Sequence, residues 1–260
     1  MSDCVVVEEH WPLGVVTINR PDVRNAMSRE VLQKLKESVK RLSRQDGLRA
    51  LVITGAGDKA FSAGADLKER QGMTKEETLA FVAELQETFQ EIAELPMPTI
   101  AAMNGDAFGG GMELALACDI RVLAVDATVG LTECAFGITP GAGGTQRLPR
   151  LVGFSGAADL IFGARRVKAE EALTLGLVDY LAQGAQDARD MALKLAESIA
   201  ANAPLAVRAA KLALRASQEL SMKEGLAREL ASYHKIIDTE DRLEGLMAFQ
   251  EGRPPQFRGR

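Results

Sequence analysis

The chain has 260 residues and a formal net charge of -5, and its Gly and Pro content is not high enough to indicate disorder. A chain of this length can bury a large core in one or two domains, and its acidic balance argues against nucleic acid as the main partner. We expect a cytoplasmic protein, because the three cysteines are widely spaced and the N-terminus has no signal-peptide pattern. We expect no membrane span, because the sequence has no long apolar run.

The first part of the chain alternates between strand and helix signals. Short apolar runs bounded by turn residues predict strands at 4–8, 14–20, 48–54, 99–103 and 120–124. Trp11 to Gly14 is expected to form the turn between the first two strands. Ser28 is expected to cap a helix that Gly47 stops, with a buried face made of Val31, Leu32, Leu35, Val39 and Leu42.

Two more helices are expected before the middle of the chain, followed by an all-helical tail. The first begins at Thr74 and ends near Leu95, before two prolines, and the second runs from the glycines at 109–111 through Cys118. After about Ala185 the pattern predicts helices only, at 186–201, 204–217, 221–236 and 239–250. We therefore expect an α/β core of about 190 residues (1–190) that carries the active site, and a C-terminal helical region (191–260).

Two segments share one order of signals. "LVITGAGDKAFSAGAD" and "TIAAMNGDAFGGGMELA" both run from a strand through a turn and a phenylalanine to a glycine cluster and a helix. This similarity indicates stacked, repeated strand–helix turns.

The first glycine group, at 55–60, fits a loose dinucleotide-binding fingerprint. Such a loop needs a helix that starts directly at its glycines, so that a pyrophosphate meets the helix N-terminus. Five residues, 60–64, intervene here before any helix can begin, which favours an ordinary turn after a strand. The next cluster, "SAGAD", is harder to explain as a turn, because its small residues allow a ligand close to the backbone.

The glycines at 109–111 have the same character. They open a helix, so free amides and the positive end of the helix dipole favour an anion or a developing oxyanion there. Close helix packing is the structural alternative. Two such clusters on successive turns favour a shared site built from backbone amides.

Glu113 and Glu133 stand in otherwise apolar stretches that follow the glycine clusters. Each taken alone can be a capping or ion-paired residue. Together with two amide sites they fit proton transfer next to a carbonyl: amides hold the oxyanion, one carboxylate moves the α-proton and the other handles water. Two close carboxylates also push one pKa up, so that one group can act as acid while the other acts as base.

With these motifs the sequence resembles the enoyl-CoA hydratase/isomerase family, also called the crotonase family. The resemblance covers essentially the whole chain and rests on "NRPDVRNAM" (19–27), "FSAGADLKE" (61–69), "NGDAFGGGMELALACDIRV" (104–122), "LTECAFGITPGAGGTQRLPRLVG" (131–153), "EALTLGLVD" (171–179) and "DRLEGLMAFQEGRPP" (241–255). It implies a crotonase-like spiral of repeated ββα units. It also implies a C-terminal helical region that builds homotrimers, usually paired into hexamers.

The resemblance further implies the roles of the site residues. The oxyanion hole falls on the backbone N–H groups of Ala65 and Gly110, and the two hydratase glutamates fall on Glu113 and Glu133. Isomerases of the family often keep only the second glutamate, so the pair favours hydration and dehydration. Gly141 matches a conformationally demanding position behind the substrate. No metal or redox cofactor is implied, because coenzyme A is part of the substrate.

Coenzyme A is expected along two segments, at Val23, Arg24, Ala26, Ala63, Asp66 and Leu67. Arg24 is the candidate phosphate contact, and an exposed charge in a turn is its structural alternative. A second basic group, at Arg208, Lys211 and Arg215, has the spacing of a solvated helix face, although it could also meet coenzyme A phosphates or RNA.

The acyl chain is the least determined part of the substrate. "GADLKER", "ELALACDIRV" and "GGTQRLPR" resemble the methylglutaconyl-CoA hydratase branch, whose substrate carries a free carboxylate. Lys68 and Arg70 are candidate partners for that carboxylate, or else solvated charges on a helix. Leu131, where many short-chain hydratases have a polar residue, also favours a specialised substrate. A general short-chain hydratase, an isomerase and a non-catalytic acyl-CoA- or RNA-binding scaffold are the alternatives.

Overall fold

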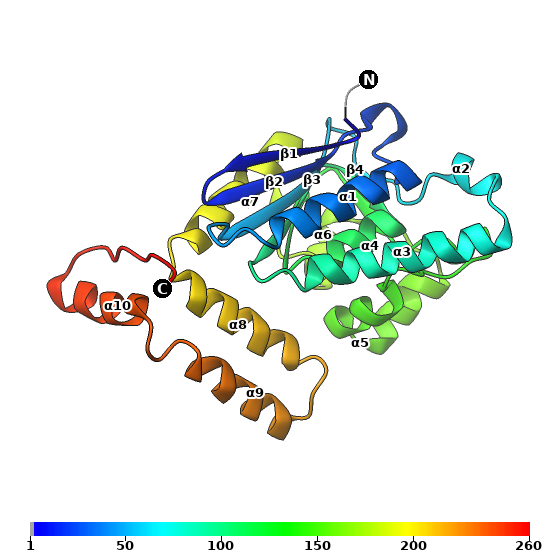
Figure 1. Ribbon diagram of the computed structural model, residues 1–260. Helices are drawn as coiled ribbons and strands as arrows, with labels where there is room; N and C mark the ends of the chain where they lie inside the picture. Colours follow the sequence, from blue (N-terminus) through cyan, green and yellow to red (C-terminus); the bar gives the residue numbers. More distant parts are fainter. Residues whose placement is uncertain (1–2) are drawn as a thin grey trace.

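The computed structural model describes residues 3–260 (Figure 1), and its strands form two sheets, between which the chain alternates from residue 50 to residue 130. The larger sheet has six strands in the order β1 (Val5–His10), β2 (Leu13–Ile18), β3 (Ala50–Gly55), β5 (Thr99–Met103), β7 (Ile120–Ala124) and β10 (Tyr180–Ala182). β1 and β2 are antiparallel, and the other neighbours are parallel. Parallel strands covered on both faces explain the unbroken apolar runs in the sequence.

The β1–β2 hairpin is tighter than the sequence suggested. His10 pairs with Leu13, so the turn is only Trp11–Pro12 rather than the four residues from Trp11 to Gly14. The strands predicted at 99–103 and 120–124 have the bounds of β5 and β7.

The smaller sheet was not predicted from the sequence. Its strands are β4 (Ala60–Ser62), β6 (Asp106–Phe108), β8 (Thr128–Gly130) and β9 (Val167–Lys168), in that order. β4, β6 and β8 are parallel neighbours, so the three turns of chain that contain them stack on one another. Each turn gives one strand to the larger sheet and the next strand to the smaller sheet. The expected repetition of strand–helix turns is therefore present, with an additional strand in each unit.

The helices are α1 (Arg29–Leu42), α2 (Leu67–Gln71), α3 (Lys75–Ala93), α4 (Gly110–Ala117), α5 (Gly144–Phe162), α6 (Ala169–Thr174), α7 (Ala185–Ala200), α8 (Pro204–Ala216), α9 (Met222–His234) and α10 (Glu240–Glu251), with 3-10 turns η1 (Pro21–Val23) and η2 (Glu133–Phe136). Ser28 caps α1 as predicted, and the predicted apolar face is buried. Gly47 does not stop this helix, because α1 already ends at Leu42. No helix within residues 3–260 is long and apolar enough to cross a membrane.

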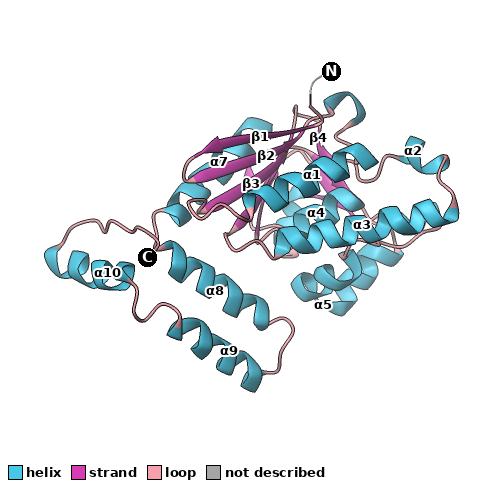
Figure 2. Ribbon diagram, viewed as in Figure 1, coloured by secondary structure: helices cyan, strands magenta, loops and turns pink. Residues whose placement is uncertain are grey.

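The C-terminal helices divide into one that covers the larger sheet and three that extend beyond the sheets. α7 packs on β3, β5 and β7, whereas α8, α9 and α10 extend outward from the sheets (Figure 2). A division at residue 190 would cut α7. The structural border between the core and the protruding helices instead lies between α7 and α8.

The basic face of α8 is not solvated, contrary to the expected helix face. The Lys211 ammonium donates to the Met97 carbonyl at 2.9 Å and pairs with Asp119 at 2.7 Å. Arg208 donates to the carbonyls of Asp46 and Leu48 at 2.9 and 3.3 Å. These cations therefore fasten α8 to the core.

Candidate active site

The two glycine clusters converge because β4 and β6 are parallel neighbours. Gly64 follows β4 with φ +89°, and a Cβ built on it would lie 2.7 Å from the Phe108 carbonyl oxygen and 3.1 Å from the Gly110 nitrogen. Any side chain at position 64 would therefore push the two segments apart. Glycine is required here both for the close approach and for the left-handed backbone.

The amides of Ala65 and Gly110 lie side by side at this junction. A Cβ built on Gly110 would be 3.8 Å from the Ala65 nitrogen. The backbone of Met27 pairs with the residues on either side of Ala65: its amide donates to the Gly64 carbonyl at 2.8 Å, and its carbonyl accepts from the Asp66 amide at 2.9 Å. Gly110 is in the first turn of α4, where amides have no helical acceptor. Within residues 3–260 neither N–H donates a hydrogen bond, so the two can bind one oxyanion together.

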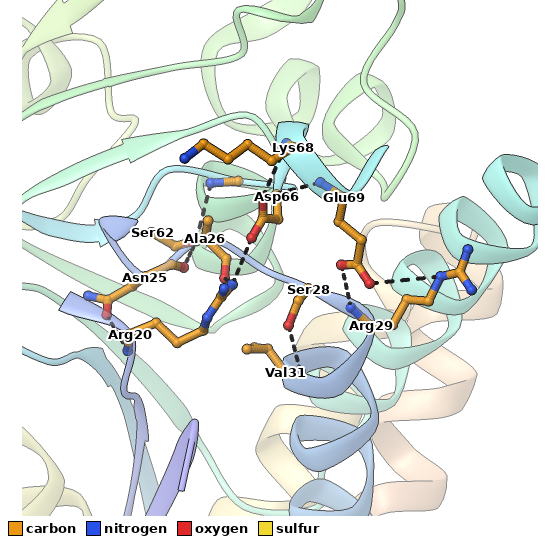
Figure 3. A network of polar contacts seen from close by, with 11 residues as sticks. Arg20, Asn25, Ala26, Ser28, Arg29, Val31, Ser62, Asp66, Lys68 and Glu69 are labelled. Carbon is orange, nitrogen blue, oxygen red and sulfur yellow. Dashed lines mark hydrogen bonds and ion pairs between the residues drawn. The ribbon is translucent and has the colours of Figure 1, made fainter. Parts of the chain in front are cut away.

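A buried polar network holds the segment around Ala65 (Figure 3). Asn25 is fully buried with φ 53°, and its side-chain amide donates to the carbonyls of Ala56 and Ala60 at 2.9 and 2.7 Å. Ser62 donates its hydroxyl to the Asn25 carbonyl at 2.8 Å. Asparagine tolerates a left-handed backbone better than most residues, which explains its place in this turn.

Asp66 connects the same network to α2. Its carboxylate caps the helix by accepting from the amides of Lys68 and Glu69, and its other oxygen pairs with the Arg20 guanidinium at 3.0 Å (Figure 3). Arg20 also donates to the Ala26 carbonyl at 2.7 Å. The Asp66 side chain is thus occupied in positioning the Ala65 loop. A contact between residue 66 and coenzyme A stays a prediction.

Glu113 is a buried carboxylate in the first turn of α4. One of its oxygens, Oε1, accepts hydrogen bonds from the amides of Ala142 and Gly144, both at 2.8 Å. Burial raises the pKa of Glu113, while these two amides and the charge of Arg147 oppose the rise. The carboxylate therefore has a fixed orientation and keeps one oxygen, Oε2, for another partner.

Glu133 begins η2 and lies against the backbone of Gly109, where a Cβ would be 3.2 Å from its Oε1. Its Oε2 is buried without a hydrogen-bond partner within residues 3–260. Burial first, and then the charge of Glu113, raise the pKa of Glu133 to about 7, and the charge of Arg70 opposes the rise. The structure thus brings the two predicted glutamates into one electrostatically coupled pair beside the two amides.

This arrangement can exchange protons at neutral pH. Burial raises the pKa of both glutamates, and that of Glu133 reaches about 7, so Glu133 gains and loses a proton near neutral pH, whereas the two amides on Glu113 oppose the rise there. One group can accept a proton from water while the other gives one to carbon, next to donors that bind an oxyanion.

The predicted coenzyme A residues lie on two adjoining segments. The Ala63 amide donates to the Arg24 carbonyl at 2.9 Å, which joins the segments directly. Val23 and Leu67 are exposed, and Ala26 is buried. Arg24 has φ 53° and an exposed side chain whose guanidinium is 3.7 Å from the Asp106 carboxylate. Lys68 is exposed on α2.

Gly141, expected at a conformationally demanding position, is constrained by packing rather than by a left-handed backbone. Gly143, two residues later, has the left-handed φ of +108°, whereas Gly141 has no positive φ. The constraint at Gly141 is steric, because a Cβ there would lie 2.7 Å from Val82 Cγ1 on α3.

Three residues of the site were missed by the sequence analysis: Arg20, Asn25 and Arg147. The guanidinium of Arg147 donates to the Ala142 carbonyl at 3.1 Å and to the Gln90 side chain at 2.8 Å, so it braces the loop that holds Glu113. Arg20 and Arg147 lie in polar stretches, where the sequence does not distinguish a buried arginine from an exposed one. Only Asn25 carried a signal, as an asparagine in a turn.

Two further cavities lie outside this site. One, of about 540 Å³, is lined by α8, α9 and the end of α3. The other, of about 580 Å³, is lined by Gly55 to Asp58, the first residues of α7 and parts of β1 and β2. β4, not a helix, follows the glycine group at 55–60, so the geometry of a dinucleotide loop is absent there.

Known proteins are similar to this chain in sequence and in fold. The chain matches the family model described as enoyl-CoA hydratase/isomerase over residues 8–260. It is 45% identical to methylglutaconyl-CoA hydratase, mitochondrial, of Mus musculus, over 97% of this chain and 81% of that protein. It is also 45% identical to enoyl-CoA hydratase domain-containing protein 2, mitochondrial, of Mus musculus, over 94% of this chain and 84% of that protein. Among solved structures, an enoyl-CoA hydratase from Bacillus anthracis has a TM-score of 0.96 at 42% identity, covering 99% of this chain and 100% of that one. The expected crotonase-like fold is thereby confirmed.

Proposed function

The chain belongs to the enoyl-CoA hydratase/isomerase family, and from this membership we propose that it adds water across the 2,3-double bond of an enoyl-CoA thioester. The observation that carries the proposal is the pair Glu113 and Glu133, buried beside the amides of Ala65 and Gly110, which donate no hydrogen bond within residues 3–260. A double-bond isomerisation needs one proton-transferring group, whereas hydration needs a second group to activate water.

In the proposed reaction Glu113 takes a proton from a water molecule while the oxygen of that water bonds to the β-carbon. The electron pair of the double bond moves toward the thioester carbonyl, whose oxygen becomes negative and is held by the two amides. Protonated Glu133 then gives its proton to the α-carbon, and the carbonyl forms again. Removing one such oxyanion donor typically costs about 3 kcal/mol of transition-state stabilisation. The same groups run the dehydration in reverse.

We assign 3-methylglutaconyl-CoA as the preferred substrate, with 3-hydroxy-3-methylglutaryl-CoA as the product. Support comes from the relative named methylglutaconyl-CoA hydratase, at 45% identity over 97% of this chain. Leu131 adds support, because many short-chain hydratases have a polar residue at its position. It lies near Glu113, since a Cβ on Gly144 would be 2.8 Å from the Leu131 side chain and 3.0 Å from Glu113 Oε1. Coenzyme A is proposed to lie along Val23, Arg24, Ala26, Ala63, Asp66 and Leu67.

An isomerase is an alternative within the family, and the Glu113→Gln variant distinguishes a hydratase from an isomerase. A hydratase should lose about 100-fold or more of its hydration rate without the group that activates water. The experiment measures hydration of crotonyl-CoA and isomerisation of a 3-enoyl-CoA by the wild type and by this variant. Full hydration activity in Glu113→Gln, or isomerisation that exceeds hydration in the wild type, would reject the hydratase assignment.

We propose in addition that the chain forms a homotrimer or a dimer of trimers through its C-terminal helices. Large apolar side chains are exposed there, including Leu226, Leu230, Leu243, Leu246, Met222 and Phe249. Apolar patches of this kind on a folded chain mark association surfaces. Light scattering of the purified chain at micromolar concentration should give three or six times 27.9 kDa, and a monomer would contradict the proposal.

A further inference from the structure

Arg147 is a cation at a place where a cation is unfavourable. It lies in the first turn of α5, where the positive end of the helix dipole opposes a positive side chain. Its guanidinium is half-buried, and within residues 3–260 it forms no ion pair with a carboxylate. Both of its hydrogen-bond acceptors, the Ala142 carbonyl and the Gln90 side chain, are neutral. Neither the helix nor an ion pair explains why this residue is charged.

The loop at 142–144 lies between Arg147 and Glu113. Glu113 Oε1 accepts from the amides of Ala142 and Gly144, both at 2.8 Å, and Arg147 donates at 3.1 Å to the Ala142 carbonyl, which lies between those two amides. Three successive peptide groups therefore point alternately to the carboxylate and to the guanidinium. A Cβ on Gly143, which has φ +108°, would clash with Arg147 Nη1, so the guanidinium lies directly against this loop. Turns whose successive amides face one point favour an anion there.

The two glutamates of the site differ in what holds them. Burial raises the pKa of Glu113, and the two loop amides and the charge of Arg147 oppose that rise. Glu133 is held less, because its Oε2 is buried without a hydrogen-bond partner within residues 3–260. Burial, and then the charge of Glu113, raise the pKa of Glu133 to about 7, against the charge of Arg70. A single proton shared by the pair therefore resides on Glu133.

Other titratable groups surround Arg147 without replacing it. Burial lowers the pKa of Arg147, the charges of Arg215 on α8 and Arg150 on α5 lower it further, and the charge of Glu113 raises it. The thiol of Cys118 on α4 is fully buried with a pKa of about 12, so it stays neutral. A guanidinium stays protonated throughout the neutral range. Neither Arg150 nor Arg215 is among the groups that act on the pKa of Glu113.

We propose that Arg147 is a positioning residue that assigns the shared proton of the pair to Glu133, by clamping the loop that holds Glu113 as an ionised carboxylate. The inference rests on the proposed function, because only ionised Glu113 can take a proton from water. Without the clamp the Ala142 and Gly144 amides lose their fixed direction, and Glu113 also loses a nearby positive charge. The proton would then move toward Glu113, where it prevents the activation of water.

The kinetic test measures kcat and KM for hydration of crotonyl-CoA from pH 5 to 9. It compares the wild type with Arg147→Met, Arg147→Lys and the matched control Arg150→Met, which removes the same charge one turn later on α5. Because the pKa of Glu113 should rise in Arg147→Met, the loss of activity on the acid side should move to higher pH. The kcat at pH 6 should fall about tenfold with little change in KM. Arg147→Lys should lie between this variant and the wild type, and Arg150→Met should keep the wild-type profile.

A second measurement does not depend on turnover. The protein is labelled with ¹³C at the side-chain carboxyl carbon of glutamate, and the resonance of Glu113 is identified by its loss in Glu113→Gln. This resonance should titrate at higher pH in Arg147→Met than in the wild type. The titration tests the role of Arg147 even if the wild type hydrates no thioester, so failure of this inference and failure of the proposed function remain distinguishable.

An unchanged titration of Glu113 in Arg147→Met would overturn the inference. So would an acid-side loss of activity that stays at the wild-type pH, because a lower kcat alone would mean that Arg147 only stabilises the fold. If Arg147→Met does not fold, the same comparison is made with Arg147→Lys. A wild-type titration of Glu113 in that variant would equally overturn the inference.

Discussion

Glu133 connects the site to a measurable pH dependence. Its pKa is raised to about 7, and the proposed reaction needs one proton shared by Glu113 and Glu133. Raising the pH through 7 removes that proton, so kcat/KM should fall above about pH 7. Hydration of an enoyl thioester releases no proton. The equilibrium constant is therefore independent of pH, and kcat/KM for dehydration must fall above about pH 7 in the same way as kcat/KM for hydration.

The measurement is kcat/KM from pH 5 to 9 in both directions, with crotonyl-CoA and its hydrated product. Residual activity of Glu133→Gln should lack the limb near pH 7, because this variant has no proton to lose there. A wild-type profile that rises through pH 7 would contradict the assignment of Glu133 as the group that must be protonated.

The glutamates could be predicted from the sequence, but their supporting residues could not. Carboxylates within apolar runs stand out, because burying a charge without a reason is costly. Arg147 and Arg20 lie among other polar residues, and their contacts with Ala142, Gln90 and Asp66 join segments far apart in the chain. No local pattern encodes such contacts.

At the scale of elements, α2 depends on its cap. Asp66→Ala removes both the cap and the ion pair with Arg20, and we expect the free energy of unfolding to fall by about 1–2 kcal/mol. The kcat/KM should fall as well, because the neighbouring Ala65 amide loses its support. Asp66→Asn keeps a capping oxygen and should lose less of both. Urea unfolding and initial rates check this order.

Asp58→Ala is the matched control, since this exposed aspartate in the preceding loop has no ion pair or side-chain hydrogen bond within residues 3–260. Its unfolding free energy should stay within about 0.5 kcal/mol of the wild type. Wild-type stability and activity in Asp66→Ala would show that the contacts of Asp66 do not position the loop.

Long elements were predictable because they carry enough residues to show a period, as the buried face of α1 does. The strands β4, β6 and β8 have three residues each, too few for an alternating pattern. They are nevertheless the elements that bring Ala65 and Gly110 together. The sequence revealed them only indirectly, as two similar segments with a phenylalanine before a glycine cluster.

For the whole molecule, the docking of α8 depends on a buried cation. Lys211 is 8% exposed and pairs with Asp119, so Lys211→Met leaves that carboxylate and the Met97 carbonyl with fewer partners. We expect the variant to lose about 3 kcal/mol of unfolding free energy. Limited proteolysis should also cut faster between α7 and α8.

Lys194→Met is the control, because this lysine is exposed on α7 and forms no ion pair within the described chain, 3–260. Equal proteolysis rates for the wild type and Lys211→Met would show that the protruding helices are held by other contacts. The packing of α7 on the sheet could not be predicted, since an amphipathic pattern does not say which surface covers it.

One measurement tests the central claim, that this chain is an enoyl-CoA hydratase, most directly. It is the steady-state hydration of 3-methylglutaconyl-CoA and of crotonyl-CoA by the wild type and by Glu133→Gln. The account predicts turnover of both thioesters by the wild type, a higher kcat/KM on 3-methylglutaconyl-CoA, and a loss of about 100-fold or more in Glu133→Gln. A wild type that binds coenzyme A thioesters but hydrates neither, or a Glu133→Gln variant with full activity, would contradict it.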